Sequence, residues 1–200
     1  MHYTELLKGV NAYASDNQNQ AGTFPRKLYP EEAFYFEVLD NTKPLTMRAI
    51  TFLKKWNRRV KINNDKLQTV CQKVPTVVLN WSLQYLPLWD HKSQIIEIFC
   101  EFIPAVKYTG TSKALHILNP GFFMMWDDKI RYGYGCSENE EGYFNFLIRT
   151  QKEIQEVIQT YTKDYPINGE ISQLIYSGRV KSIVKLLDEY NFAKYTKGWI

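Results

Sequence analysis

Apolar residues recur at intervals of three and four along most of this 200-residue chain. Such spacing places them on one face of an α-helix, and that face must pack against another element. The pattern is clearest at residues 45–60, 95–106, 144–161, 171–175 and 180–190. Helix follows helix through short connections, which predicts a compact all-α domain of about nine short helices.

Three other segments qualify this pattern. Residues 74–79 (VPTVVL) are β-branched, but they continue into NWSLQYL and fit a buried helix at least as well as a strand. Residues 15–25 (SDNQNQAGTFP) are polar and contain Gly and Pro, which is typical of a loop. Pro104 is expected to disrupt the end of the helix at 95–106. No repeat or shift in composition divides the chain, so residues 1–200 are expected to form a single all-α domain.

The composition argues against several classes of protein. The three cysteines lie far apart without a C-x-x-C pair, which argues against a zinc site, an iron–sulfur cluster and a disulfide framework. No stretch approaches the roughly 20 apolar residues of a membrane helix, and the N-terminus lacks a signal-peptide pattern. A net charge of +4 permits a polyanionic partner without requiring one. We therefore expect a cytoplasmic monomer with no membrane segment, metal or cofactor.

The strongest chemical signal lies in the sequence TGTSKALHILNPGFFMMWDDKIRYGYG. A turn at Gly110 is expected to start a helix whose first turn contains Lys113. Unpaired backbone N–H groups at such a start, from Gly110, Thr111 and Ser112, would bind a phosphate. The positive helix end and the apolar neighbours both disfavour an ammonium, so the pKa of Lys113 is expected to be lowered. Lys113 is then a candidate amine nucleophile, and the alternative is an ordinary solvated lysine.

An Asn-Pro-Gly break after this helix is expected to reverse the chain. Asp127 then stands immediately before a second helix, DKIRYGYG, which it is expected to cap. In that position one carboxylate oxygen can face back toward Lys113. Asp128 is expected to be a stabilising charge in the first turn of the second helix.

The segments GTSK (110–113) and WDDKI (126–130) together resemble the helix-hairpin-helix DNA glycosylases, the superfamily of endonuclease III and the 8-oxoguanine glycosylases. In that family a Gly-x-Lys hairpin end is followed by a helix and then by a short aspartate segment. The longer phrase SKALHILNPGFFMMWDDKIRYGYG is similar to an uncharacterised bacterial branch of the fold. The hairpin here keeps one glycine, and the chain lacks the four-cysteine cluster loop of typical endonuclease III proteins.

The resemblance implies a helix-hairpin-helix glycosylase fold, with the hairpin and catalytic segment at about residues 104–135. It implies that Lys113 attacks the sugar C1′ and that Asp127 assists by deprotonating the lysine and stabilising positive charge on the sugar. The implied activity is a DNA glycosylase, bifunctional with AP-lyase activity, that works through a lysine Schiff base without a cofactor. Its implied partner is double-stranded DNA that contains a damaged or modified base.

Residue type and position suggest further candidates for contacts with the DNA backbone and for a base pocket. The basic residues either follow the DNA phosphates or form a solvated face: Lys54, Lys55, Arg58, Arg59 and Lys129. Four side chains are candidates for a pocket that holds a flipped base: Phe24, Arg26, His116 and Trp126. For His116 the alternative is a hydrogen-bonded core histidine, and for Trp126 it is a packed core aromatic.

Two other functions stay open at this stage. A non-catalytic helix-hairpin-helix module would bind DNA structure or another protein, and an all-α domain with a purely structural role would bind no DNA. If the chain is a glycosylase, an oxidised purine and a modified pyrimidine are both compatible with it. DNA repair and host defence are equally open.

Overall fold

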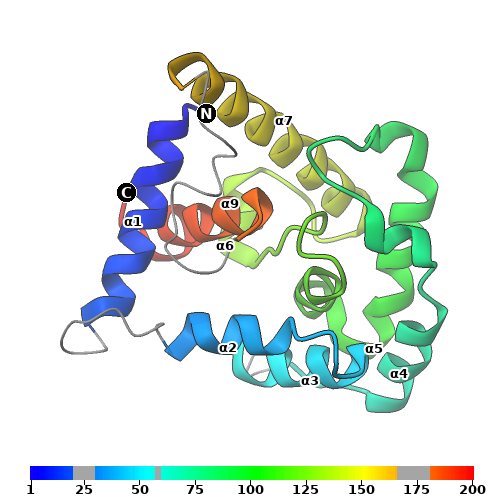
Figure 1. Ribbon diagram of the computed structural model, residues 1–200. Coiled ribbons are helices and arrows are strands. Elements are labelled where there is room, and N and C mark those ends of the chain that lie inside the picture. Colours follow the sequence, from blue (N-terminus) through cyan, green and yellow to red (C-terminus); the bar gives the residue numbers. More distant parts are fainter. Residues whose placement is uncertain (20–29, 57–59, 166–180) are drawn as a thin grey trace.

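The structure, a computed structural model, describes residues 1–19, 30–56, 60–165 and 181–200 (Figure 1). Every regular element in these ranges is helical, which confirms the predicted all-α class. The α-helices are α1 (Tyr3–Asn19), α2 (Pro30–Val38), α3 (Leu45–Trp56), α4 (Asn64–Lys73), α5 (Lys92–Leu118), α6 (Asp128–Gly133), α7 (Glu140–Asp164) and α9 (Ile183–Asn191). Two 3-10 turns, η1 (Thr76–Asn80) and η2 (Leu88–His91), and one π-helical turn, η3 (Phe192–Lys197), complete the set.

Helix α5 organises the fold. It packs against α3 and α4, and also against α7, while α1 packs across α9 and contacts α7 and η3 (Figure 1). The apolar stripe of α5 is fully buried, as its spacing predicts: Ile95, Phe99, Phe102 and Val106. Burying each such side chain contributes about 1.5–3 kcal/mol relative to leaving it in water. None of the helices in the described ranges has the length and apolarity to cross a bilayer.

A smaller apolar cluster joins α2, α3 and the end of α5. Its buried members are Tyr35, Val38, Phe52, Ile117 and Met125. This cluster fixes the C-terminal half of α5 against the C-terminal end of α3. It therefore sets the position of Lys113, which lies one helical turn before Ile117.

The main correction to the sequence prediction concerns α5. Pro104 lies inside the helix, and the break comes at Lys107, whose φ of 61° and ψ of 174° are not helical. Gly110 is not a turn residue, because it lies buried in the half of α5 that follows the break. A Cβ at this position would be 2.9 Å from Val106 Cβ and 3.1 Å from Val60 Cγ2, so the glycine serves close packing.

Two other predictions change. Helix α1 continues to Asn19, so residues 15–19 of the predicted loop are helical and the rest of that segment lies outside the described ranges. Residues 76–80 form the 3-10 turn η1, neither a strand nor an α-helix, after the extended Pro75. Val78 is buried in the core there, while Val77 and Leu79 are exposed. The predicted helix at 171–175 lies outside the described ranges.

Candidate functional site

Lys113 is half-buried on the second half of α5, two turns after the break at Lys107. Its Nζ donates a hydrogen bond of 2.9 Å to the carbonyl oxygen of Trp56, the last residue of α3. Burial lowers the pKa of Lys113, and the charges of Asp127 and Asp188 offset part of that shift. A lowered pKa increases the neutral, nucleophilic fraction of the amine near neutral pH. The structure thus gives this lysine the predicted pKa direction, although its cause is burial and not a first-turn position.

Asp127 caps α6, as predicted. Its Oδ1 accepts a hydrogen bond of 2.9 Å from the backbone N–H of Ile130, and its Oδ2 accepts one of 2.7 Å from the hydroxyl of Thr196. Both carboxylate oxygens are therefore engaged, and Asp127 and Lys113 form no ion pair, although the charge of Asp127 acts on the lysine through space. Asp128 is exposed in the first turn of α6 and pairs with Arg131 at 3.4 Å.

The predicted phosphate site at Gly110, Thr111 and Ser112 is wrong, because all three residues are buried. Ser112 Oγ accepts a hydrogen bond of 3.2 Å from the backbone N–H of Trp126, which ties α5 to the segment before α6. The prediction failed because it placed the helix start at Gly110, three residues after the real break. The residues that reach the surface at this break are Lys107, Tyr108 and Thr109.

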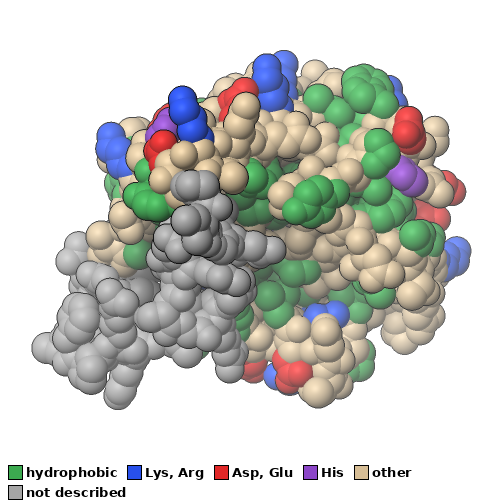
Figure 2. Space-filling view, turned by 45° about the horizontal axis from the view of Figure 1, so that its top comes forward, with side chains coloured by type: hydrophobic (Ala, Val, Ile, Leu, Met, Phe, Trp, Pro, Cys, Tyr) green, Lys and Arg blue, Asp and Glu red, His purple; other side chains and the backbone are tan. Residues whose placement is uncertain are grey.

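The predicted basic residues that the structure describes lie on two helices, α3 and α6. Lys54 is exposed on α3, and the ammonium of Lys55 lies 4.2 Å from the ring centroid of Phe34. Lys129 is exposed on α6 and donates to the carbonyl oxygen of Thr196 at 2.9 Å. Arg58 and Arg59 lie outside the described residues. On the face shown in Figure 2, basic side chains are scattered among hydrophobic and polar ones and form no continuous track.

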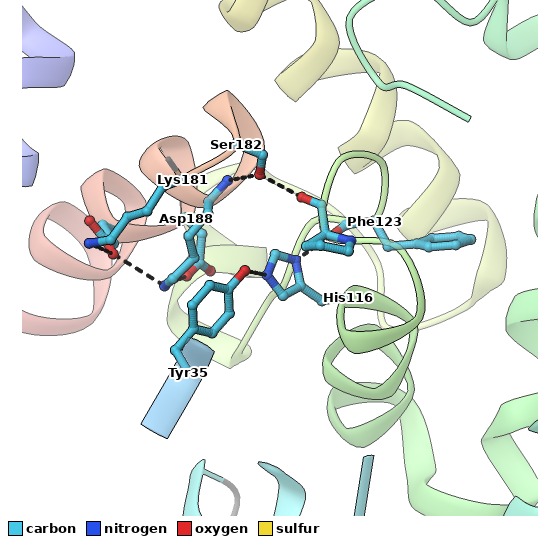
Figure 3. Close-up of polar contacts among 9 residues, drawn as sticks. Tyr35, His116, Phe123, Lys181, Ser182 and Asp188 are labelled. Atoms are coloured by element: carbon cyan, nitrogen blue, oxygen red, sulfur yellow. Dashed lines mark hydrogen bonds and ion pairs between the residues drawn. The ribbon is translucent and has the colours of Figure 1, made fainter. Parts of the chain in front are cut away.

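His116 has the hydrogen bonds of a core histidine (Figure 3). Its Nδ1 lies 2.7 Å from the carbonyl oxygen of Phe123, which can only accept, so Nδ1 carries the proton. Its Nε2 then accepts from the hydroxyl of Tyr35 at 2.8 Å. Burial lowers the pKa of His116 to about 4, so the ring is neutral at physiological pH.

Trp126 is also part of the core. Its ring makes edge contacts with Phe99 and Tyr143, and only 1% of the residue is exposed. His116 is therefore a hydrogen-bonded core histidine and Trp126 a packed core aromatic, and neither lines a pocket for a base. The other two candidates for the base pocket, Phe24 and Arg26, lie outside the described residues.

Four charged side chains between residues 181 and 189 are buried together, which the sequence analysis did not predict. We call Lys181, Lys185, Asp188 and Glu189 the buried ion cluster (Figure 3). Lys185 Nζ lies 2.8 Å from Asp188 Oδ2 and 3.6 Å from Glu189 Oε1, and Lys181 Nζ lies 2.8 Å from the same Glu189 oxygen. Side-chain exposure is 1–5% for three members and 9% for Asp188.

Aromatic rings from three different helices surround Lys185. Its ammonium lies 5.1 Å from the ring centroids of Tyr35 and Trp56 and 5.5 Å from that of Tyr13. Burial alone would lower the pKa of Lys185, but the charges of Asp188 and Glu189 raise it well above its ordinary value. Lys185 is therefore charged in the interior.

The buried ion cluster borders the candidate site through Trp56. The ring of this residue faces Lys185, and its carbonyl oxygen accepts from Lys113. The sequence carried no clear signal for the burial of this cluster. Lys185, Asp188 and Glu189 lie three and four positions apart and so share one face of α9, a pattern that is typical of a solvated face and did not predict their burial.

Within the described ranges, no group of His, Cys, Asp and Glu side chains could hold a metal ion. In comparisons with known proteins, no family model, no curated protein and no solved structure matches the chain.

Proposed function

We propose that the protein is a DNA glycosylase with associated AP-lyase activity, in which Lys113 is the nucleophile and Asp127 the assisting carboxylate. The observation that supports this most is the state of Lys113. It is a half-buried amine with a lowered pKa, held by one backbone carbonyl and subject to the charge of an aspartate that caps the next helix. Lysines with lowered pKa values in such settings are typical of Schiff-base chemistry.

The proposed reaction uses only the protein, the DNA and water. The neutral amine of Lys113 attacks C1′, the glycosidic bond breaks, and the base leaves with the bonding electron pair and takes up a proton. Asp127 accepts the proton that the lysine loses and stabilises positive charge at the sugar. The sugar ring opens to an imine, loss of a 2′ proton expels the 3′ phosphate, and water hydrolyses the imine to release the enzyme.

The break in α5 is the part of the site that we propose to face the DNA backbone. Lys107, Tyr108 and Thr109 reach the surface there, two turns from Lys113 along one helix. The conformation of Lys107 falls in a region of φ and ψ that is almost confined to glycine. Strain of this kind is often found where a backbone must approach a ligand closely, which supports a contact with phosphate.

Borohydride trapping tests the proposed function. Duplex oligonucleotides that carry 8-oxoguanine, uracil, 5-hydroxyuracil, hypoxanthine or an abasic site would be incubated with the protein and sodium borohydride. We expect a covalent protein–DNA adduct with at least one duplex, because borohydride reduces the imine to a stable secondary amine. Absence of any adduct, together with absence of base release across the panel, would contradict the proposal.

The pH dependence of trapping gives a second prediction. Burial lowers the pKa of Lys113 below its ordinary value of 10.5, so the neutral amine is populated at a lower pH than in an exposed lysine. We expect the rate of adduct formation on an abasic-site duplex to rise with pH and to reach its plateau well below pH 10.5. A rate that still rises in proportion to hydroxide between pH 9 and 10.5 would instead indicate an ordinary lysine.

A non-catalytic helix-hairpin-helix module is the second candidate. The observation that favours it is that both carboxylate oxygens of Asp127 already accept hydrogen bonds, so this aspartate can serve as a structural cap alone. This candidate predicts salt-dependent binding to DNA without base release or an adduct on any duplex. A structural domain without a nucleic-acid partner predicts that no such binding is observed at low salt.

A further inference from the structure

We propose that Thr196, on the C-terminal turn η3, is a positioning residue that holds the Asp127 carboxylate in its working orientation. This inference rests on the proposed function, because it assigns a partner to the proposed catalytic aspartate. Thr196 lies 69 positions after Asp127 in the chain, so the contact exists only in the folded protein. The helix cap, by contrast, joins Asp127 to Ile130, only three positions away.

The two hydrogen bonds on Asp127 fix the carboxylate at two points. Oδ1 accepts from the backbone N–H of Ile130 at 2.9 Å, which anchors it to α6. Oδ2 accepts from the Thr196 hydroxyl at 2.7 Å, which prevents the group from rotating about its terminal torsion. Such a torsion is otherwise broad for an aspartate, so a cap alone would leave the second oxygen without a fixed direction.

The structure also holds η3 itself in place against α6. The carbonyl oxygen of Thr196 accepts a hydrogen bond of 2.9 Å from Lys129 Nζ, so one residue makes two bonds to the start of α6. The ring of Tyr195 packs directly on Gly133, where a Cβ would collide with it, and its centroid lies 5.4 Å from that of Tyr134. We call the contacts of Tyr195 and Thr196 with α6 the η3 clamp.

The backbone form of η3 fits this role. Residues 192–197 form a π-helical turn directly after α9. Such turns insert an extra residue into a helical path, and they are frequent at functional sites. Here the turn presents the side chain of Thr196 and the ring of Tyr195 to α6. The half-buried hydroxyl of Thr196 donates to the carboxylate and so fixes the direction of its second oxygen.

Thr196→Val and Thr196→Ser form the matched pair that tests the clamp. Valine keeps the shape but removes the hydroxyl, whereas serine keeps the hydroxyl. On a duplex that the wild-type protein cleaves, we expect Thr196→Val to reduce kcat by about ten- to hundredfold, as for loss of a hydrogen bond to a charged group. KM should change less than about threefold, because the carboxylate is proposed to act on the reacting sugar and not in binding the duplex. Thr196→Ser should restore at least a third of the wild-type kcat.

Equal losses with valine and serine, or a loss confined to KM, would overturn the proposal. A stability measurement tests the contact without catalysis. We expect Thr196→Val to lower the melting temperature in the wild-type background but to have little effect when Asp127→Ala has already removed the acceptor. Additive effects of the two substitutions would show that the hydrogen bond is not formed. The two failures are therefore distinct: no reaction by the wild-type protein contradicts the proposed function, and additivity contradicts the clamp.

Discussion

Replacing Lys113 with glutamine is expected to abolish the borohydride-trapped adduct completely on every duplex with which the wild-type protein reacts. An amide nitrogen cannot form an imine, so no intermediate remains for borohydride to reduce. Base release should fall by at least about a hundredfold, because water would have to replace the amine without its positioning. The measurement is denaturing gel electrophoresis of the reduced reaction, with the released base quantified in parallel.

The loss should not come from unfolding. The folded-state pKa of Lys113 lies below its unfolded value, so below pH 10.5 the unfolded chain binds this proton more readily and the ammonium opposes folding. Glutamine removes that charge and can still donate to the carbonyl oxygen of Trp56, so the melting temperature should be unchanged or higher. Lys152→Gln, the same change at an exposed position of α7, is the control and should react as the wild type does. An adduct of Lys113→Gln equal to that of the wild-type protein would exclude Lys113 as the nucleophile.

The helical elements of this fold were largely predictable because their signals are local. The long helix expected at 144–161 lies within α7, and the last predicted helix, at 180–190, overlaps α9 up to Tyr190. The break at Lys107 had no such signal, since nothing in a lysine indicates a conformation almost confined to glycine. Packing around the break determines it: Gly110 lies against Val106 and Val60, and the carbonyl oxygen of Ala105 accepts from the backbone N–H of Asn63. The prediction therefore placed the turn at the glycine.

The candidate site likewise contains local contacts, which the sequence predicts, and contacts between distant residues, which it does not. The cap that Asp127 makes on α6 spans three residues and was predictable from the order of residue types. The hydrogen bond from Thr196 spans 69 residues and was not. The buried ion cluster joins α9 to rings on α1, α2 and α3. In the sequence its α9 charges share one helical face, as solvated charges usually do, so their burial depends on elements far away in the chain.

Replacing Lys185 with methionine is expected to destabilise the protein by about 3–5 kcal/mol, the cost of removing one partner from a buried ion pair. Methionine has a similar length and fills the space between the rings of Tyr35 and Trp56, so the loss is mainly electrostatic. Asp188 would lose its ion-pair partner at 2.8 Å, and Glu189 would keep only Lys181. Urea unfolding followed by circular dichroism measures the change. The exposed substitution Lys152→Met, on α7, is the control and should shift stability by less than about 0.5 kcal/mol.

The double variant Lys185→Met/Asp188→Leu shows what the ion pair contributes as a unit. Removing both charges leaves Lys181 paired with Glu189, so the interior is again neutral and most of the lost stability should return. If the double variant regains stability but cleaves its duplex more slowly than the wild type, the cluster serves the site that it borders through Trp56. If it regains both stability and activity, the ion pair is replaceable by apolar packing. A double variant as unstable as Lys185→Met alone would show that shape, and not charge, makes Lys185 necessary at this position.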